Sequence, residues 1–204
     1  MTVNFLSARN RIRLSRLGAV LIIGTLSVSL TGWGSLEPFL EHLLSLVGWV
    51  LIAVAVAGRV WCTSHIGGNK NTTLITIGPY SVCRNPLYFF SFVGGLGVMF
   101  VTETLSFPLL FCVAFAFYYP KVIRREEEAL LKFHGAEYMA YCSKVSQFWP
   151  KFSLLTEPNT YVVSASQFRS GLADMVWFIV AGGLVEYLEG LHVSGYLPVL
   201  LHIY

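Results

Sequence analysis

Charged residues are scarce in this 204-residue chain, of which only 12% are Asp, Glu, Lys or Arg. Soluble domains carry about 25% charged residues. Hydrophobic residues make up 55% of the chain, and the mean hydropathy is +0.63. This balance excludes an ordinary water-soluble domain and indicates a protein whose main solvent is the bilayer.

Cysteine is also rare, with four residues that show no paired spacing. A disulfide framework and a structural zinc site both need closely spaced pairs. The sequence therefore predicts neither a disulfide framework nor a metal site. The better interpretation of Cys62, Cys83, Cys112 and Cys142 is that of small apolar side chains that pack in the interior.

Basic residues are missing from most of the chain and are confined to three places. The 14 Lys and Arg residues precede the first apolar run (Arg9, Arg11, Arg13, Arg16), separate the second from the third (Arg59, Lys70, Arg84), or separate the fourth from the last (Lys121, Arg124, Arg125, Lys132, Lys144, Lys151, Arg169). If the runs cross a membrane, these places face one side, which the positive-inside rule identifies as the cytoplasm. The net charge of +3 is modest and scattered over membrane-flanking loops, so a nucleic-acid partner is not expected.

Five apolar runs are candidates to cross the bilayer, at residues 17–36, 43–58, 87–102, 105–120 and 173–188. The first could be a signal peptide, but its apolar core is longer than usual and further helices follow, so we expect it to remain. Residues 191–204 are too short to cross comfortably and suggest an interfacial or re-entrant helix. The predicted fold is an all-α, polytopic membrane helix bundle with about five transmembrane helices and a cytosolic cofactor-binding helix. The N-terminus is expected in the cytosol.

Three regions follow from this organisation. Residues 1–58 are predicted to form a transmembrane hairpin, 59–150 a catalytic core, and 151–204 a loop followed by transmembrane or interfacial helices. A very short turn at 103–106 predicts that the third and fourth helices pack antiparallel. The fourth helix is predicted to continue beyond the membrane, and Gly135 indicates a bend or a close contact there. Helical spacing predicts that this continuation has one apolar face, formed by Ile123, Leu130, Leu131, His134, Tyr138, Tyr141 and Val145.

Two polar segments flank this helix pair on its cytosolic side. One is Gly78-Pro-Tyr-Ser-Val-Cys-Arg-Asn-Pro-Leu-Tyr88, which leads into the third helix, and the other is Arg124-Arg-Glu-Glu-Glu-Ala-Leu-Leu-Lys-Phe-His-Gly-Ala-Glu-Tyr-Met-Ala-Tyr141, which leads out of the fourth. Because the two helices are tightly paired, the segments are expected to meet at the membrane boundary.

Together the segments resemble the G-P-Y-x-x-x-R-H-P-x-Y and E-E-x-x-L-x-x-x-F-G-x-x-Y-x-x-Y patterns of integral-membrane methyltransferases. These include the isoprenylcysteine carboxyl methyltransferases, their bacterial relatives and, more distantly, the phospholipid methyltransferases. The resemblance covers about residues 45–150. It implies that S-adenosylmethionine binds at the cytosolic interface and that a lipid or lipophilic small molecule, with a carboxylate, thiol or amine, enters from the bilayer.

The site residues that the resemblance implies fall on both segments. Arg84, Asn85 and Tyr88 would be the catalytic group, and the cofactor would contact Gly78, Pro79, Tyr80, Arg84, Asn85, Tyr88, Gly95, Gly97, Glu126 and Glu127. The match of Gly95 and Gly97 to a short G-x-G is weak, because glycines are common in membrane helices. Asn85 replaces the family's histidine and cannot titrate near neutral pH.

The chemistry of methyl transfer agrees with this assignment. A carboxylate can hold an ammonium or ribose hydroxyls, and an arginine can hold a carboxylate. Helical spacing turns Glu127 toward the bundle, places Glu126 at its flank and points Glu128 away. The alternatives are a solvated charge run at Glu126–Glu128 and a topology anchor at Arg84.

Two other functions remain open from the sequence. A sterol-reductase-like enzyme would use NADPH, but the chain lacks the arginine expected shortly before Pro150 to meet a 2′-phosphate. A non-catalytic membrane scaffold or transport subunit would bind no cofactor.

Overall fold

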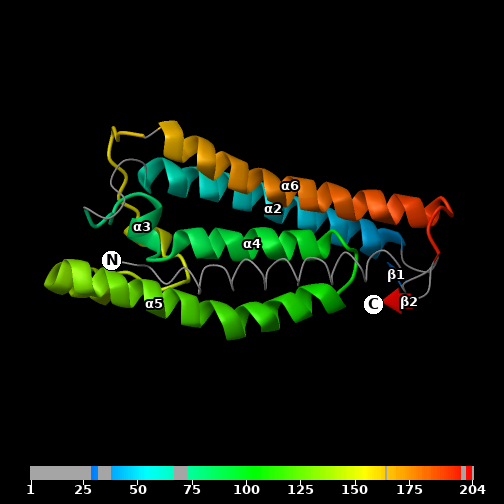
Figure 1. Cartoon of the computed structure of the whole chain (residues 1–204), viewed down its shortest axis with the longest axis horizontal. Coiled ribbons are helices and arrows are strands. Elements are labelled where there is room, and N and C mark those ends of the chain that lie inside the picture. Colours follow the sequence, from blue (N-terminus) through cyan, green and yellow to red (C-terminus); the bar gives the residue numbers. More distant parts are fainter. Residues whose placement is uncertain (1–28, 32–37, 67–72, 164, 199–200, 204) are drawn as a thin grey trace.

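The computed structural model describes residues 29–31, 38–66, 73–163, 165–198 and 201–203. Long helices lie side by side and form an elongated bundle (Figure 1). They are α2 (Pro38–Ile66), α4 (Pro86–Phe100), α5 (Ser106–Lys144) and α6 (Ala165–Val193). The short elements are α3 (Pro79–Val82), a 3₁₀ turn (Phe152–Leu154), β1 (Ser29–Thr31) and β2 (Leu201–Ile203).

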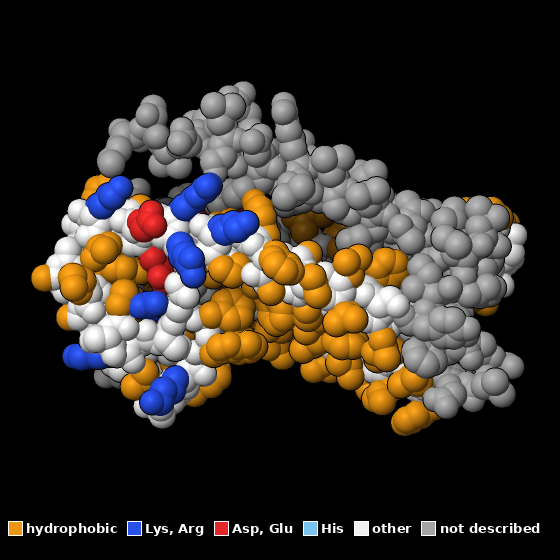
Figure 2. All heavy atoms as spheres, turned by 90° about the horizontal axis from the view of Figure 1, so that it is seen from below, with side chains coloured by type: hydrophobic (Ala, Val, Ile, Leu, Met, Phe, Trp, Pro, Cys, Tyr) orange, Lys and Arg blue, Asp and Glu red, His pale blue; other side chains and the backbone are white. Residues whose placement is uncertain are grey.

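The predicted membrane bundle is confirmed for the described part of the chain. Three of its helices are long and apolar enough to span a bilayer, Phe39–Ile66, Ser106–Lys144 and Phe168–Val193, and Pro86–Phe100 is apolar but shorter. They correspond to four of the five predicted runs; the first run, 17–36, lies outside the described residues apart from Ser29–Thr31. Figure 2 shows apolar side chains covering the middle of one face, with Lys and Arg gathered at one end.

The pairing of α4 with α5 agrees with the sequence. Helix α4 begins after Asn85 with Pro86 at its first position, where a missing N–H costs nothing. It ends at Phe100, and α5 starts at Ser106 after a tight turn in which Glu103 has a φ of 56°. Helices α4 and α5 then lie side by side in opposite directions (Figure 1). As a result, the N-terminus of α4 and the extension of α5 lie at the same end of the bundle.

Helix α2 packs against both α4 and α6 through small residues. A Cβ added at Gly97 of α4 would lie 2.8 Å from the carbonyl oxygen of Gly48 in α2, and one added at Gly182 of α6 would lie 3.0 Å from Cδ1 of Ile52 in α2. The backbones can approach this closely only because these side chains are absent. The core beside this contact consists of Ile52, Val98, Met99, Val101, Phe107 and Val185.

Gly97→Ala is expected to destabilise the bundle by about 1–3 kcal/mol, because the added methyl group overpacks a backbone contact. The matched control is Gly183→Ala in α6, where a Cβ would meet nothing within 4 Å. The control should be neutral or stabilising. The measurement is the thermal unfolding midpoint in detergent, and equal midpoints for the two variants would contradict this account of the α2–α4 contact.

Helix α5 continues well past the apolar run, as predicted, and bends at Gly135. This glycine has φ 52° and ψ −121°, so the helix is interrupted there. The last segment turns back to the bundle, and Tyr138, Tyr141 and Val145 are buried. The predicted continuous apolar face is wrong at Leu130 and Leu131, which are 37% and 42% exposed. The bend returns only the residues after Gly135 to the bundle.

The predicted interfacial or re-entrant helix at 191–204 is also wrong in the described residues. Helix α6 extends to Val193 and then stops at a turn in which Gly195 has a φ of 76°, followed by Pro198. A left-handed glycine followed by a proline is a common way to end a helix. Leu201–Ile203 instead pairs in parallel with Ser29–Thr31.

Candidate functional site at the α3 end of the bundle

Gly78 anchors the loop that leads into α3. Its φ of 59° and ψ of −132° are accessible to glycine but strained for other residues. A Cβ at this position would lie 2.3 Å from Nε2 of His65, so the histidine ring occupies the space that a side chain would need. Pro79 then starts α3 at its first position. Gly78 and Pro79 therefore set the direction of the backbone toward Arg84.

The segment that follows α5 is hydrogen-bonded to this loop. The N–H of Gly78 donates to the carbonyl of Thr156 at 2.8 Å, and the N–H of Thr156 donates to the Ser81 hydroxyl at 2.9 Å. Nε2 of His65 lies 3.1 Å from Oε1 of Glu157, and the His65 ring stacks on Tyr161. Three stretches distant in sequence, around residues 65, 78 and 156, are thus joined into one support.

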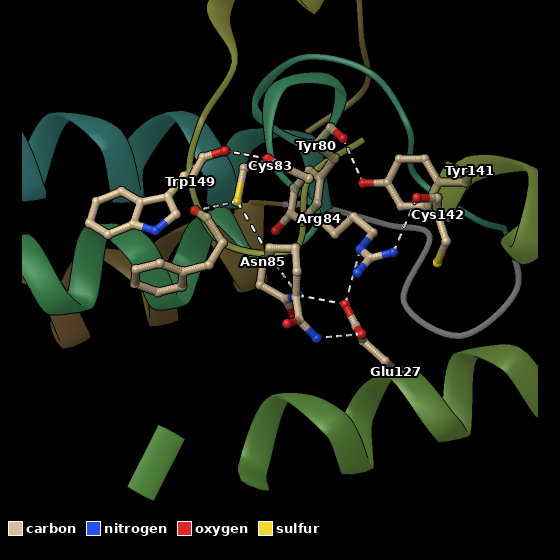
Figure 3. A network of polar contacts seen from close by, with 11 residues as sticks. Tyr80, Cys83, Arg84, Asn85, Glu127, Tyr141, Cys142 and Trp149 are labelled. Atoms are coloured by element: carbon tan, nitrogen blue, oxygen red, sulfur yellow. Dashed lines mark hydrogen bonds and ion pairs between the residues drawn. The ribbon is translucent and has the colours of Figure 1, made fainter. Parts of the chain in front are cut away.

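Glu127 is the centre of a polar network that joins both sequence segments (Figure 3). Its Oε1 lies 3.1 Å from Nε of Arg84 and accepts a hydrogen bond from Nδ2 of Asn85 at 2.9 Å. Its Oε2 accepts from Nε2 of Gln147 at 2.7 Å. The side chains of Arg84 and Glu127 are only 14% and 15% exposed, so the pair is largely shielded from water. The prediction that Glu127 turns toward the bundle is confirmed.

Asn85 uses its amide group as a donor. Besides the bond to Glu127, its Nδ2 donates to the carbonyl of Gln147 at 3.1 Å. The residue is 9% exposed and caps the start of α4. A side chain that spends both amide hydrogens on fixed partners positions its neighbours and needs no titratable proton.

Tyr88 and Glu126 form a second contact on the more exposed side of the network. The Tyr88 hydroxyl donates to Oε1 of Glu126 at 2.6 Å, and its ring packs edge-on against Tyr119. Tyr88 lies one turn after Asn85 in α4, so the two contacts between α4 and α5 are adjacent. Glu128 is exposed, as predicted.

Tyr80 borders the network and is held by its backbone. Its carbonyl accepts a hydrogen bond from the Tyr141 hydroxyl at 2.6 Å (Figure 3). Its own hydroxyl is buried and has no hydrogen-bond partner among the described residues. Burial raises the pKa of this phenol well above its ordinary value, so the phenol stays protonated.

Gly95 and Gly97 lie elsewhere. A Cβ at Gly95 would meet the ring of Phe111 at 2.4 Å, and Gly97 faces α2, as described above. Gly97 lies 12 residues after Asn85 in α4, which is about 18 Å along the helix. Close helix packing explains both glycines, and their contact with a cofactor stays a prediction.

Three further residues belong to this region and were not predicted from the sequence: Gln147, His65 and Cys83. Cys83 donates its thiol to the carbonyl of Phe148 at 3.0 Å, and burial raises its pKa to about 11. Two backbone hydrogen bonds, each 2.9 Å long, also join residues 82–84 to residues 146–151. The N–H of Arg84 donates to the carbonyl of Ser146, and the N–H of Lys151 donates to the carbonyl of Val82. No periodic pattern marks residues 146–151. Only their position after the long α5 helix could have indicated that they pack against residues 82–84.

An apolar bundle with a shielded ion pair and several hydroxyls at one end defines an integral-membrane protein with a polar interfacial site. The phospholipid methyltransferase family matches residues 43–137, a range that contains the first sequence segment and the second as far as Glu137. The chain belongs to this family of integral-membrane methyltransferases.

Two relatives are similar over nearly the whole chain. The cobalt-zinc-cadmium resistance protein CzcN of Cupriavidus metallidurans is 36% identical over 194 residues, which cover 95% of this chain and 88% of the relative. The nickel-cobalt-cadmium resistance protein NccN of Alcaligenes xylosoxydans xylosoxydans is 35% identical over 190 residues, covering 93% and 88%. No solved structure matches the chain.

Proposed function

We propose that this protein transfers a methyl group from S-adenosylmethionine to a lipophilic acceptor at the end of the bundle where α3 lies. The observation that supports this most strongly is that Arg84 and Asn85, from the first family-like segment, both contact Glu127 of the second. Family membership supplies the reaction class, and the site supplies groups of suitable chemistry.

The donor set fits the polar ends of S-adenosylmethionine. Glu126 presents a carboxylate on the exposed side of the network, suited to an ammonium or to ribose hydroxyls. Arg84 provides a planar cation for the cofactor carboxylate. The loop at Gly78, Pro79 and Tyr80 would border the nucleoside. When bound, this cofactor supplies a methyl group on a sulfonium, a leaving group that departs as a neutral thioether.

The chain's own residues would then act mainly by positioning. Glu127 is fully engaged by Arg84, Asn85 and Gln147, so it orients these side chains instead of accepting a proton from the acceptor. An in-line displacement depends on alignment, and a preassembled network reduces the entropy lost on reaching that alignment. An acceptor that is already an anion would need no base.

A transfer assay tests the activity. Membranes containing the protein are incubated with S-adenosylmethionine labelled in its methyl group, and label is counted in the organic extract. Wild-type protein and Glu128→Gln are expected to give label in that extract, and Glu127→Gln to give at least tenfold less. Equal incorporation by all three would remove the polar network from the reaction.

Arg84→Lys separates a cofactor contact from a topology anchor. Lysine keeps the positive charge but cannot reproduce a planar, bidentate contact. We expect the variant to bind S-adenosylmethionine about tenfold more weakly, corresponding to about 1.4 kcal/mol, as measured by calorimetry in detergent. Wild-type affinity in Arg84→Lys would assign the residue to topology alone.

We also propose that the α3 end faces the cytosol, since the described Lys and Arg residues gather there (Figure 2). In a chain with its native cysteines replaced, Ser153→Cys should react with a membrane-impermeant maleimide only from the cytosolic side. Ser194→Cys, at the other end of α6, should react only from the opposite side. Labelling of both from one side would contradict the proposed topology.

The names of the two relatives point to a cellular role in metal resistance, which we extend to this chain as a proposal. In the part of the chain that the structure describes, no group of three or more His, Cys, Asp or Glu side chains is arranged to hold a metal ion. We therefore attribute the role to methylation. In a metal-sensitive strain lacking CzcN, wild-type protein should restore growth on cobalt, zinc or cadmium and Glu127→Gln should not; restoration by both would separate the role from this site.

A further inference from the structure

Arg59 is a cation placed within an apolar transmembrane helix. It lies seven residues before Ile66, the last residue of α2, which is about 10 Å from the helix end. Ionisable side chains at such positions are costly and usually mark a ligand or transport path. Neither of the two family-like segments contains this residue.

The guanidinium is packed against neighbouring helices. Its NH1 donates to the Ser91 hydroxyl of α4 at 2.5 Å, and its central carbon lies 5.7 Å from the ring centroid of Phe178 in α6. Its Nε is buried and has no hydrogen-bond partner among the described residues. An arginine that served only as a topology anchor would extend this group to the lipid headgroups.

The charge of Arg59 is also not neutralised within the described part of the chain. The ion pair of Arg84 with Glu127 and the contact of His65 with Glu157 do not include Arg59. A partly buried cation without a carboxylate partner has a strong energetic preference for an incoming anion.

A second donor without a hydrogen-bond partner among the described residues lies in α3, which packs against α2. The Tyr80 hydroxyl is buried, and burial raises its pKa well above the ordinary value. The protonated phenol can therefore donate a hydrogen bond in the same region. Two buried donor atoms, Nε of Arg59 in α2 and the hydroxyl of Tyr80 in α3, thus lack an acceptor among the described residues.

The geometry points to an oxyanion-binding site formed by Arg59 and Tyr80, which holds the carboxylate or phosphate of an amphiphile that enters from the bilayer. An amphiphile suits this position because Arg59 lies within α2, a helix long and apolar enough to span a bilayer. Ser91 lies six residues after Asn85 in α4, about 9 Å deeper than the Glu127 network. Resting on the proposed function, this amphiphile is the methyl acceptor.

The test measures amphiphile binding directly and does not depend on catalysis. Protein in a neutral detergent is titrated with dodecanoate, dodecyl phosphate or dodecanol, and bound adducts are counted by native mass spectrometry. Wild-type protein should bind at least one of the two anions more tightly than dodecanol, and the preferred anion identifies a carboxylate or a phosphate acceptor. Arg59→Met should weaken anion binding at least tenfold and leave dodecanol binding unchanged. Tyr80→Phe should weaken anion binding about threefold.

Lys121→Met is the matched control, because Lys121 is an exposed cation in α5. Anion binding by this variant should equal that of the wild type. Wild-type anion binding by Arg59→Met, or an equal loss of dodecanol binding, would overturn the oxyanion site.

A parallel titration with S-adenosylmethionine separates this site from the proposed function. If the anion binds through Arg59 and S-adenosylmethionine does not bind, the oxyanion site stands and the methyltransferase proposal fails. If S-adenosylmethionine binds and the anion does not depend on Arg59, the proposed function stands and the oxyanion site is wrong.

Discussion

Glu127→Gln is expected to lower the affinity for S-adenosylmethionine about a hundredfold and to destabilise the α3 end of the bundle. The carboxylate neutralises Arg84 in a largely shielded pair and accepts from Asn85 and Gln147. The glutamine amide keeps the shape but leaves the guanidinium without a counter-charge, which costs about 3 kcal/mol at a shielded site. Calorimetry gives the affinity and thermal unfolding in detergent gives the stability.

Neighbouring glutamates provide matched controls for this prediction. Glu128→Gln, at an exposed position, should behave as the wild type in both measurements. Glu126→Gln should weaken cofactor binding about tenfold, because a neutral amide loses the charge-assisted bond to the cofactor, with little change in stability since its amide oxygen can still accept from Tyr88. The same small effect at all three positions would indicate a solvated charge run and would contradict the network as a binding site.

Gly78→Ala is expected to abolish cofactor binding in the folded fraction and to destabilise the protein by about 3 kcal/mol or more. The residue has a positive φ, which costs about 1–3 kcal/mol for a residue with a Cβ. The added carbon would also lie 2.3 Å from the His65 ring, which is itself buried and held by Glu157. Displacing that ring would shift the loop that positions Arg84.

Gly135→Ala separates these two causes. Gly135 has a similar conformation, with φ 52° and ψ −121°, but a Cβ there would meet nothing within 4 Å. It should therefore show the conformational cost alone and retain cofactor binding. If thermal unfolding gave the same loss for both variants, contact with His65 would contribute nothing, and our account of the Gly78 loop would be wrong.

The convergence of the two polar segments was predictable because it depends on connectivity alone. Helices joined by a turn as short as 101–105 must lie antiparallel, so the start of α4 and the continuation of α5 share one end. Helical spacing then distinguished Glu127, which pairs with Arg84, from Glu128, which is exposed. Both inferences use geometry that does not depend on packing details.

The remaining parts of the site were not predictable, because tertiary contacts decide them. Gln147 reaches Glu127 only because α5 bends at Gly135 and the following segment returns beneath α3. No local pattern specifies that path. The bend also explains why Leu130 is exposed although its spacing predicted a buried face. A glycine predicts a break in a helix but not the direction taken after it.

Local motifs were also ambiguous where either helix packing or cofactor binding could explain the same residue. Gly97 matches a short cofactor-binding pattern, yet its lack of a side chain is already required by the approach of Gly48 in α2. Asn85 departs from the family's histidine, but its amide makes the two donor contacts that position Glu127 and Gln147. In both cases the role depends on which residues are in contact in the fold, and the sequence alone does not show those contacts.

Calorimetric titration of the detergent-purified protein with S-adenosylmethionine, and separately with NADPH, tests the central claim most directly. The account predicts saturable binding of S-adenosylmethionine, about a hundredfold weaker in Glu127→Gln and unchanged in Glu128→Gln, with no binding of NADPH. Binding of NADPH alone would indicate a reductase, and binding of neither by folded protein would indicate a non-catalytic membrane component; either result would contradict the methyltransferase proposal.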